Sequence, residues 1–180
     1  MKKIVSIIAG LIFSTCNSQS NKKFDLDQVL SLEYDSDIVI AIDEYLNEKS
    51  EFGEKIEKLN SSQKTVLFVE NLEREVNNGG FNQFYFNSSG DFSTETLDAL
   101  LKIGAKKTAE VLKIANSEFP NGIIPKDREQ RIKIIEQIED KSNEIWNSLD
   151  DKFYTSENEI DNLTDLLITF IKSNKKDFKE

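Results

Sequence analysis

Carboxylates are the side chains of this sequence with the most capacity for chemistry, because histidine is absent and cysteine occurs only once. The 180 residues include 33 Asp and Glu against 23 Lys and Arg. The lack of histidine removes the commonest general base and the commonest metal ligand. A single cysteine forms neither an intrachain disulfide nor a cysteine metal cluster. The chemistry left open is carboxylate catalysis, calcium binding or recognition of a basic partner.

Neither carboxylate catalysis nor a cation site has a supporting pattern. A pair of carboxylates can hydrolyse glycosides without histidine, but no spacing selects a pair, and the one tryptophan, Trp146, lies beside the apolar stripe of a predicted helix. The acid-rich stretches 25–35 and 161–167 lack the ligand spacing and central glycine of a calcium loop. We therefore expect no cofactor, no metal and no enzyme. An envelope enzyme that uses carboxylates is the least favoured alternative.

The acids are grouped along the chain, which favours a binding surface. Residues 25–57 hold eleven acids and two lysines, and residues 136–165 hold ten acids and two lysines. Such surfaces repel nucleic acid and attract a basic protein, although acids on a solvated helix can also serve solubility alone. Steps of three and four place several acids on one helical face. The predicted partner-binding residues are Glu136, Glu139, Asp140, Glu144, Asp150 and Asp151.

The N-terminus predicts export. Two lysines precede an apolar run over residues 4–13, which is too short to span a bilayer but suits a signal-peptide core. Cys16 follows, as in bacterial lipoprotein signals, although Phe13 and Thr15 depart from the usual cleavage-site residues. We expect removal of residues 1–15 and lipid attachment at Cys16. The protein would then sit in the cell envelope, facing the periplasm or on the outer membrane, with net charge changed from −10 to −12. Plain secretion, or a buried cysteine, is the alternative.

Behind this segment we predict a polar tether over residues 16–35 and one all-α domain over residues 36–178. Hydrophobic residues at 38% and charged residues at 31% are typical of a soluble globular chain. Apolar residues recur at helical spacing, and no run shows strand alternation. We expect helices over 36–46, from 60 or 61 to a glycine pair, over about 93–119 with a bend or close packing at Gly104, over 127–149, and from about 160 onward. Ser93 or Thr94, and Asp127 with Gln130, are the expected caps for two of these helices.

The most distinctive stretch is VNNGGFNQFYFNSSGD, residues 76–91. A phosphate-binding loop would need a preceding strand, a lysine or P-loop glycine spacing, and none is present. We expect Gly79 or Gly80 to end a helix in a left-handed cap. Phe81, Phe84 and Tyr85 should then face the core from the next helix. The surrounding amides are expected to cap helix ends and turns, with a small polar pocket as the alternative.

This stretch resembles the signature of a bacterial family, the DNA-mimic-protein C-terminal domain family. The family pattern E-V-x-N-G-G-F-x-Q-F-F-x-N-S-x-G runs here from Glu75 to Gly90, with Tyr85 in place of the usual Phe. The block over 99–119 and LDDKFY over 149–154 are also similar, so the resemblance covers roughly residues 37–178. It implies an all-helical fold. The signature residues expected to maintain that fold are Asn78, Gly79, Gly80, Phe81, Gln83, Phe84, Asn87 and Gly90.

The resemblance also bears on function. The family takes its name from a member read as imitating the phosphate pattern of DNA to occupy a DNA-binding protein. An exported chain does not meet a transcription factor. The predicted function is therefore non-catalytic binding of a basic protein, for example by an exported immunity protein that covers a toxin. Cytoplasmic DNA mimicry is the alternative, and it requires that the N-terminal run is not a signal.

Overall fold

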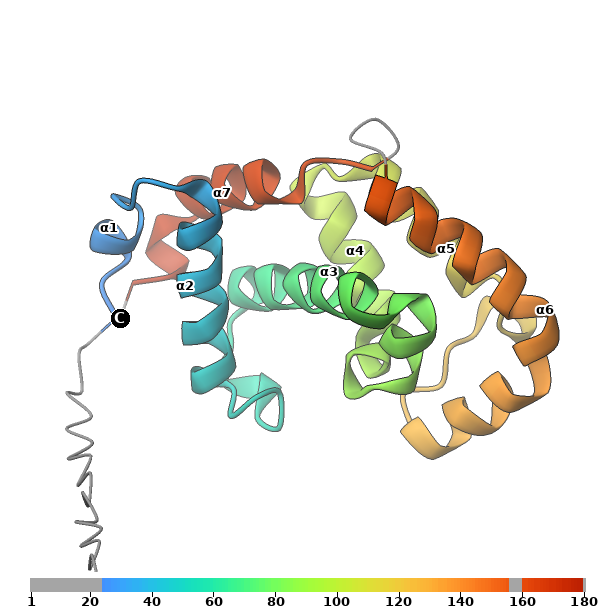
Figure 1. Cartoon of the computed structure of the whole chain (residues 1–180). Helices are drawn as coiled ribbons and strands as arrows, with labels where there is room; N and C mark the ends of the chain where they lie inside the picture. The colour runs from blue at the N-terminus through green and yellow to red at the C-terminus, as the bar shows by residue number, and fades with distance from the viewer. Residues whose placement is uncertain (1–23, 156–159, 180) are drawn as a thin grey trace, which may run out of the picture.

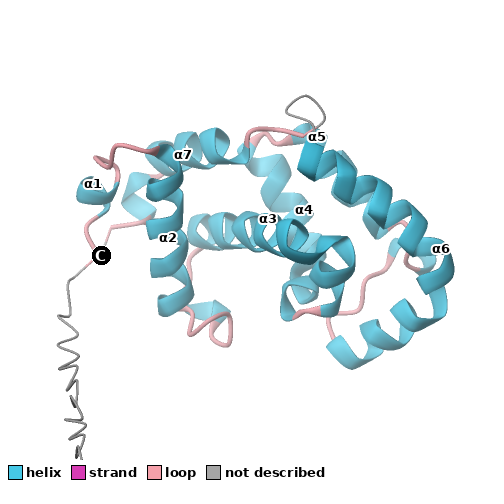
Figure 2. Cartoon of the chain, in the orientation of Figure 1, coloured by secondary structure: helices cyan, strands magenta, loops and turns pink. Residues whose placement is uncertain are grey.

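The computed structural model describes residues 24–155 and 160–179, and within these residues it is all-helical (Figures 1 and 2). Seven α-helices and four short 3₁₀ helices are present there, with no strand, which confirms the predicted fold class. The α-helices are α1 (Leu26–Val29), α2 (Asp35–Lys49), α3 (Ser61–Phe86), α4 (Ser93–Ile103), α5 (Lys106–Asn116), α6 (Arg128–Thr155) and α7 (Leu163–Ser173).

Helix α3 is the central element of the domain. Helices α2 and α7 lie at its N-terminal end, α4 packs along it, and α6 runs past its C-terminal end (Figure 1). The predicted stripe of Val66, Val69, Leu72 and Val76 is completely buried. An apolar stripe at this spacing must be covered by other elements, which explains why the remaining helices gather around α3.

The domain begins earlier than the predicted tether allowed. Phe24 stacks on Tyr45 with the ring centroids 3.8 Å apart, and Leu26 is buried. Near the other end of the chain, Lys179 Nζ lies 2.6 Å from Asp27 Oδ2. The segment from Phe24 onward therefore packs on α2 rather than acting as a tether. The predicted signal peptide and Cys16 lie outside the described residues.

Local polar contacts set several helix ends. The Asn60 side chain accepts the backbone N–H of Gln63 at 3.0 Å, and the Gln63 side chain accepts the backbone N–H of Asn60. The two bonds make a capping box at the start of α3. Asp127 Oδ1 accepts the backbone N–H of Gln130 at 2.8 Å before α6. Gly104 ends α4 at φ 88° and ψ 12°. This left-handed residue is the predicted bend between α4 and α5.

The predicted cap of α4 at Ser93 or Thr94 is wrong. The residue before the helix is Phe92, and it makes no side-chain capping bond. Ser93 is buried, and its hydroxyl donates to Asn116 Oδ1 at 2.7 Å. The hydroxyl therefore links α4 to α5 instead of serving the local backbone.

Candidate functional site

The glycine pair interrupts α3 and separates two helical segments at a bend, as the sequence predicted. Gly79 (φ −162°, ψ 23°) and Gly80 (φ 73°, ψ −175°) leave helical geometry, and the chain returns to helix at once. The predicted left-handed cap is therefore wrong, because ψ at Gly80 is extended. Beyond the bend, Phe81, Phe84 and Tyr85 are completely buried, as predicted. The motif directs aromatic side chains into the core.

Asp150 holds this bend from α6. Its Oδ1 accepts the backbone N–H of Phe81 at 2.8 Å. A Cβ atom added to Gly80 would lie 2.1 Å from Asp150 Oδ2. Burial raises the pKa of the Asp150 carboxyl, and the bond from Phe81 partly opposes that rise. Asp150 was predicted to bind a partner, but the bend frees a backbone N–H that needs an acceptor, and this half-buried carboxylate supplies it.

The amide side chains of the motif stabilise the bend and the turn after it. We call this part of the chain, residues 75–91, the corner. The carboxylate of Glu75 accepts from Gln83 Nε2 at 2.7 Å, from Asn87 Nδ2 at 2.9 Å and from Ser89 Oγ at 3.1 Å. These bonds tie α3 before the bend to α3 after it and to the turn that follows. Asn78, by contrast, is exposed. The amides Gln83 and Asn87 therefore have structural partners.

Arg131, which sequence reasoning missed, holds the corner from α6. It is completely buried. Its Nε donates to Tyr85 O at 2.6 Å, and one terminal nitrogen donates to Asn87 O at 2.9 Å and to Asp91 Oδ1 at 2.6 Å. A Cβ atom added to Gly90 would lie 2.9 Å from Arg131 Nε. The available signal was an arginine in register with the apolar stripe of α6.

Tyr85, where the family pattern has Phe, also finds a partner. Its hydroxyl donates to Asn116 Oδ1 at 2.6 Å, and its ring lies 5.0 Å from Trp146. Trp146 Nε1 in turn donates to Ala115 O at 3.1 Å. The buried Tyr85 hydroxyl and the buried Trp146 N–H therefore each have an acceptor within the domain. These contacts give the motif a structural role at the corner.

Four of the six predicted partner-binding acids form an exposed group on α6. Glu136, Glu139, Asp140 and Glu144 are exposed, and none of them makes a hydrogen bond or ion pair with the described residues. Steps of three and four residues keep them together along the helix. We call these four residues the α6 acidic surface. Asp151 is also exposed on α6, whereas Asp150 points to the bend.

Several acids elsewhere are neutralised within the chain. Asp43 pairs with Arg74 at 2.6 Å, Asp91 pairs with Arg131 at 2.6 Å, and Glu95 pairs with Lys126. Lys141, which interrupts the α6 acidic surface, lies 3.4 Å from Glu118 of the α5–α6 connection. The α6 acidic surface therefore presents carboxylates that the described part of the chain does not neutralise.

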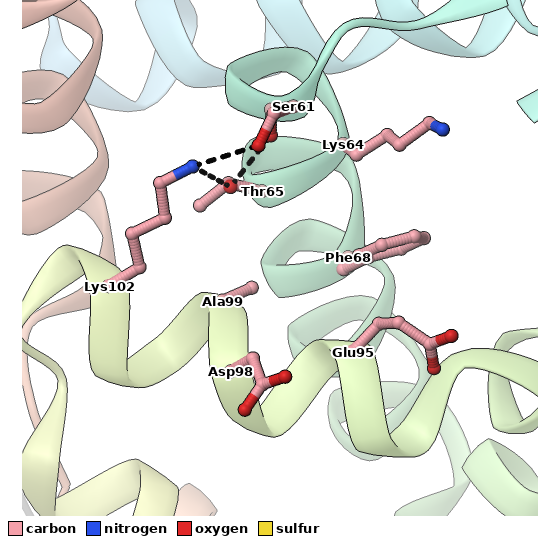
Figure 3. A pocket seen from close by; sticks show the side chains of 8 residues that line it. All are labelled: Ser61, Lys64, Thr65, Phe68, Glu95, Asp98, Ala99 and Lys102. Atoms are coloured by element: carbon pink, nitrogen blue, oxygen red, sulfur yellow. Dashed lines mark hydrogen bonds between the residues drawn. The ribbon is translucent and has the colours of Figure 1, made fainter. Parts of the chain in front are cut away.

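A cavity of about 380 Å³ lies between α3 and α4 (Figure 3). Lys102 reaches across from α4, and its Nζ lies 3.2 Å from both Ser61 Oγ and Thr65 Oγ1. Glu95 and Asp98 line the same cavity from α4. Its charges are of both signs and nearly balance, which does not select a ligand. The described residues contain no group of three or more acids, histidines or cysteines placed to hold a metal ion.

No helix among the described residues combines the length and the apolar character needed to cross a bilayer. This finding concerns residues 24–155 and 160–179 alone.

The candidate functional site is a surface and not a cavity. It is the α6 acidic surface, which stands on a helix that the buried motif fixes to α3.

Comparison with protein families gives a match over most of the helical domain. The model of a family described as DMP19-like protein matches residues 57–174. Comparisons with curated proteins and with solved structures gave no match. The matched residues hold α3 to α7, and so they include the motif, Arg131 and the α6 acidic surface. Since the match spans more than half of the chain, the protein belongs to the DMP19-like family, the DNA-mimic type that its glycine–phenylalanine motif indicated.

Proposed function

We propose that this protein is a non-catalytic binding domain that engages a basic protein through the α6 acidic surface. One observation carries the proposal: four exposed carboxylates on one helix lack a counter-charge among the described residues. A lysine or arginine surface on a partner would supply it. Exposed ion pairs contribute only about 0.2–1 kcal/mol each, so the surface would act through several contacts, orientation of the partner and faster association.

A DNA-binding protein is the second candidate partner, and family membership favours it. The four carboxylates span eight residue steps of α6, which is about 12 Å of helix, or one charge per about 4 Å along the axis. A single DNA strand carries charge at a similar density, one per about 3.4 Å. The similarity in charge spacing extends over this short stretch only. DNA mimicry also requires that the protein is cytoplasmic.

Whether the chain is exported decides between the two candidate partners. We propose that it is exported and lipid-anchored at Cys16. The support is the sequence pattern of residues 1–16. An exported immunity protein that covers a toxin is one concrete form. Membrane fractionation of the wild type and of Cys16→Ser tests this point. Release of the variant from the membrane supports anchoring, whereas an uncleaved wild-type chain in the cytosol favours DNA mimicry.

Affinity capture with the full-length chain in detergent tests binding itself. The test variant combines Glu136→Gln, Glu139→Gln, Asp140→Asn and Glu144→Gln. The matched control combines Glu33→Gln, Asp37→Asn, Glu54→Gln and Glu57→Gln, because these acids are also exposed and their replacement removes the same charge. The wild type and the control should recover a basic partner that the α6 variant loses. Equal recovery by all three would reject the α6 acidic surface as the binding site.

A further inference from the structure

A second cavity, of about 540 Å³, opens at the C-terminal end of α2. It is lined by Asp43, Glu44, Asn47, Glu48, Phe52 and Arg74. Helix α2 lies across the opposite end of α3 from α6, so this cavity is separate from the α6 acidic surface (Figure 1). Five of its six lining residues also lie before residue 57, where the family match begins.

Two carboxylates of this cavity lack a counter-charge. Asp43 is paired with Arg74 at 2.6 Å and also accepts from Asn47 Nδ2 at 2.9 Å. Glu44 and Glu48 are exposed and make no ion pair or hydrogen bond with the described residues. They are four residues apart, an arrangement of like charges that repels on a helix. The negative end of the α2 dipole adds to the same potential.

Neighbouring cations are already occupied elsewhere. Lys55 and Lys58 lie 2.8 Å and 2.5 Å from Glu51. Lys49 turns to Tyr45, with its Nζ 3.1 Å from the hydroxyl oxygen. Arg74, the one cation that lines the cavity, is bound to Asp43 and Asn71. Three carboxylates and one guanidinium leave the cavity with a net charge of −2.

Phe52 gives the cavity an aromatic wall that is open to solvent. The residue is 79% exposed, the highest value among the large apolar residues that the structure describes. The backbone beneath it is held firmly, since the N–H of Phe52 donates to Asn47 O at 2.7 Å and the N–H of Lys55 donates to Ser50 O at 2.8 Å. An aromatic face beside uncompensated carboxylates attracts a cation on both counts.

We propose that this cavity holds an arginine side chain of the basic partner, with the guanidinium over the Phe52 ring and its N–H groups on Glu44 and Glu48. The occupant is chosen by charge complementarity and by shape. A guanidinium is planar, stacks on aromatic faces and donates in a fork to two acceptors, whereas a lysine ammonium does none of these as well. The inference rests on the proposed function, because it assumes a basic protein partner, and it adds a second point of contact.

Binding of two peptides of equal charge tests the cavity. Labelled hexa-arginine and hexa-lysine are titrated against the full-length chain in detergent at one salt concentration. The variants are Phe52→Gly and Glu44→Gln/Glu48→Gln. The controls are Tyr34→Ala, a second exposed aromatic, and Glu54→Gln/Glu57→Gln, two exposed acids of the same region. Thermal unfolding confirms that each variant is folded.

The wild type should bind hexa-arginine more tightly than hexa-lysine, and both cavity variants should reduce that preference two- to fivefold, as expected for an exposed cation–π contact. The controls should keep the preference. A preference that survives in Phe52→Gly would overturn the cavity proposal. The α6 variant separates the two proposals: if it alone weakens binding of both peptides, the proposed function stands without the cavity, and if no variant changes either affinity, both proposals fail.

Discussion

The carboxylate of Asp150 lies 2.8 Å from the backbone nitrogen of Phe81 and occupies the space into which a side chain at Gly80 would project. The two residues are 69 positions apart in sequence. The bend in α3 and the C-terminal part of α6 therefore form one structural unit. This unit fixes the helix on which the α6 acidic surface stands.

Replacing Gly80 with alanine should destabilise the fold by about 2–4 kcal/mol. Gly80 combines a positive φ with an extended ψ, a conformation that costs an L-residue roughly 1–3 kcal/mol, and the new Cβ would lie 2.1 Å from Asp150 Oδ2. Urea unfolding measures the loss. Gly122→Ala is the matched control, because Gly122 has φ 68° with nothing within 4 Å of the added Cβ. Both variants place an L-residue at positive φ, but only Gly80→Ala also combines it with an extended ψ and meets Asp150, so equal destabilisation would contradict this account.

Replacing Arg131 with methionine should cost about 3–5 kcal/mol, the usual loss when one partner of a buried ion pair is removed. The variant leaves Asp91 and the carbonyls of Tyr85 and Asn87 without their donor. Arg128→Met on the same helix is the control, since Arg128 is exposed and its contacts among the described residues are a hydrogen bond to Phe86 O and a cation–π contact with the Phe86 ring. Its expected loss is under about 1 kcal/mol. Similar melting temperatures for the two variants would contradict the role of Arg131.

Ionisation of the Glu70 carboxyl should lower the free energy of unfolding as the pH rises. Burial, with the charges of Glu73 and Asp43 as smaller causes, raises the pKa of Glu70 from 4.5 to about 8, and its Oε1 has no hydrogen-bond partner among the described residues. The folded state then binds the proton more tightly than the unfolded chain. This contribution to stability is fully present below about pH 4.5 and is lost as pH rises through about 8.

Glu70→Gln should remove that dependence. Relative to the variant, the wild type should lose on the order of 4 kcal/mol of unfolding free energy between pH 4.5 and 8. Urea unfolding across this range measures the difference. Glu54→Gln, at an exposed site, should follow the wild type. Parallel pH profiles for the wild type and Glu70→Gln would contradict the raised pKa of Glu70.

The sequence predicted the elements whose signals are local. The stripe from Val66 to Val76, the aromatic trio after the glycine pair and the left-handed turn at Gly104 all follow from periodicity or backbone preference. The capping contact of Asp127 with Gln130 also joins near neighbours. Such features depend on a few adjacent residues, and so they can be read without knowing the fold.

The errors came from contacts between residues distant in sequence. Ser93 was expected to cap α4, but Asn116, which lies 23 residues away, takes its hydroxyl. Asp150 was grouped with the surface acids, but the backbone of Phe81 recruits it. Phe24 was placed in a tether because its partner, Tyr45, lies 21 residues further along the chain, on α2. In each case a tertiary partner competes with the local role, and the sequence alone does not reveal that partner.

The most direct test of the α6 acidic surface is the salt dependence of partner binding. The dissociation constant of the captured partner is measured from low to high salt for the wild type, the α6 variant and the matched four-acid control. We expect the α6 variant to bind at least about tenfold more weakly at low salt, with a shallower salt dependence, and to approach the wild type at high salt, where exposed charges are screened. Superimposable curves for the wild type and the α6 variant would contradict it.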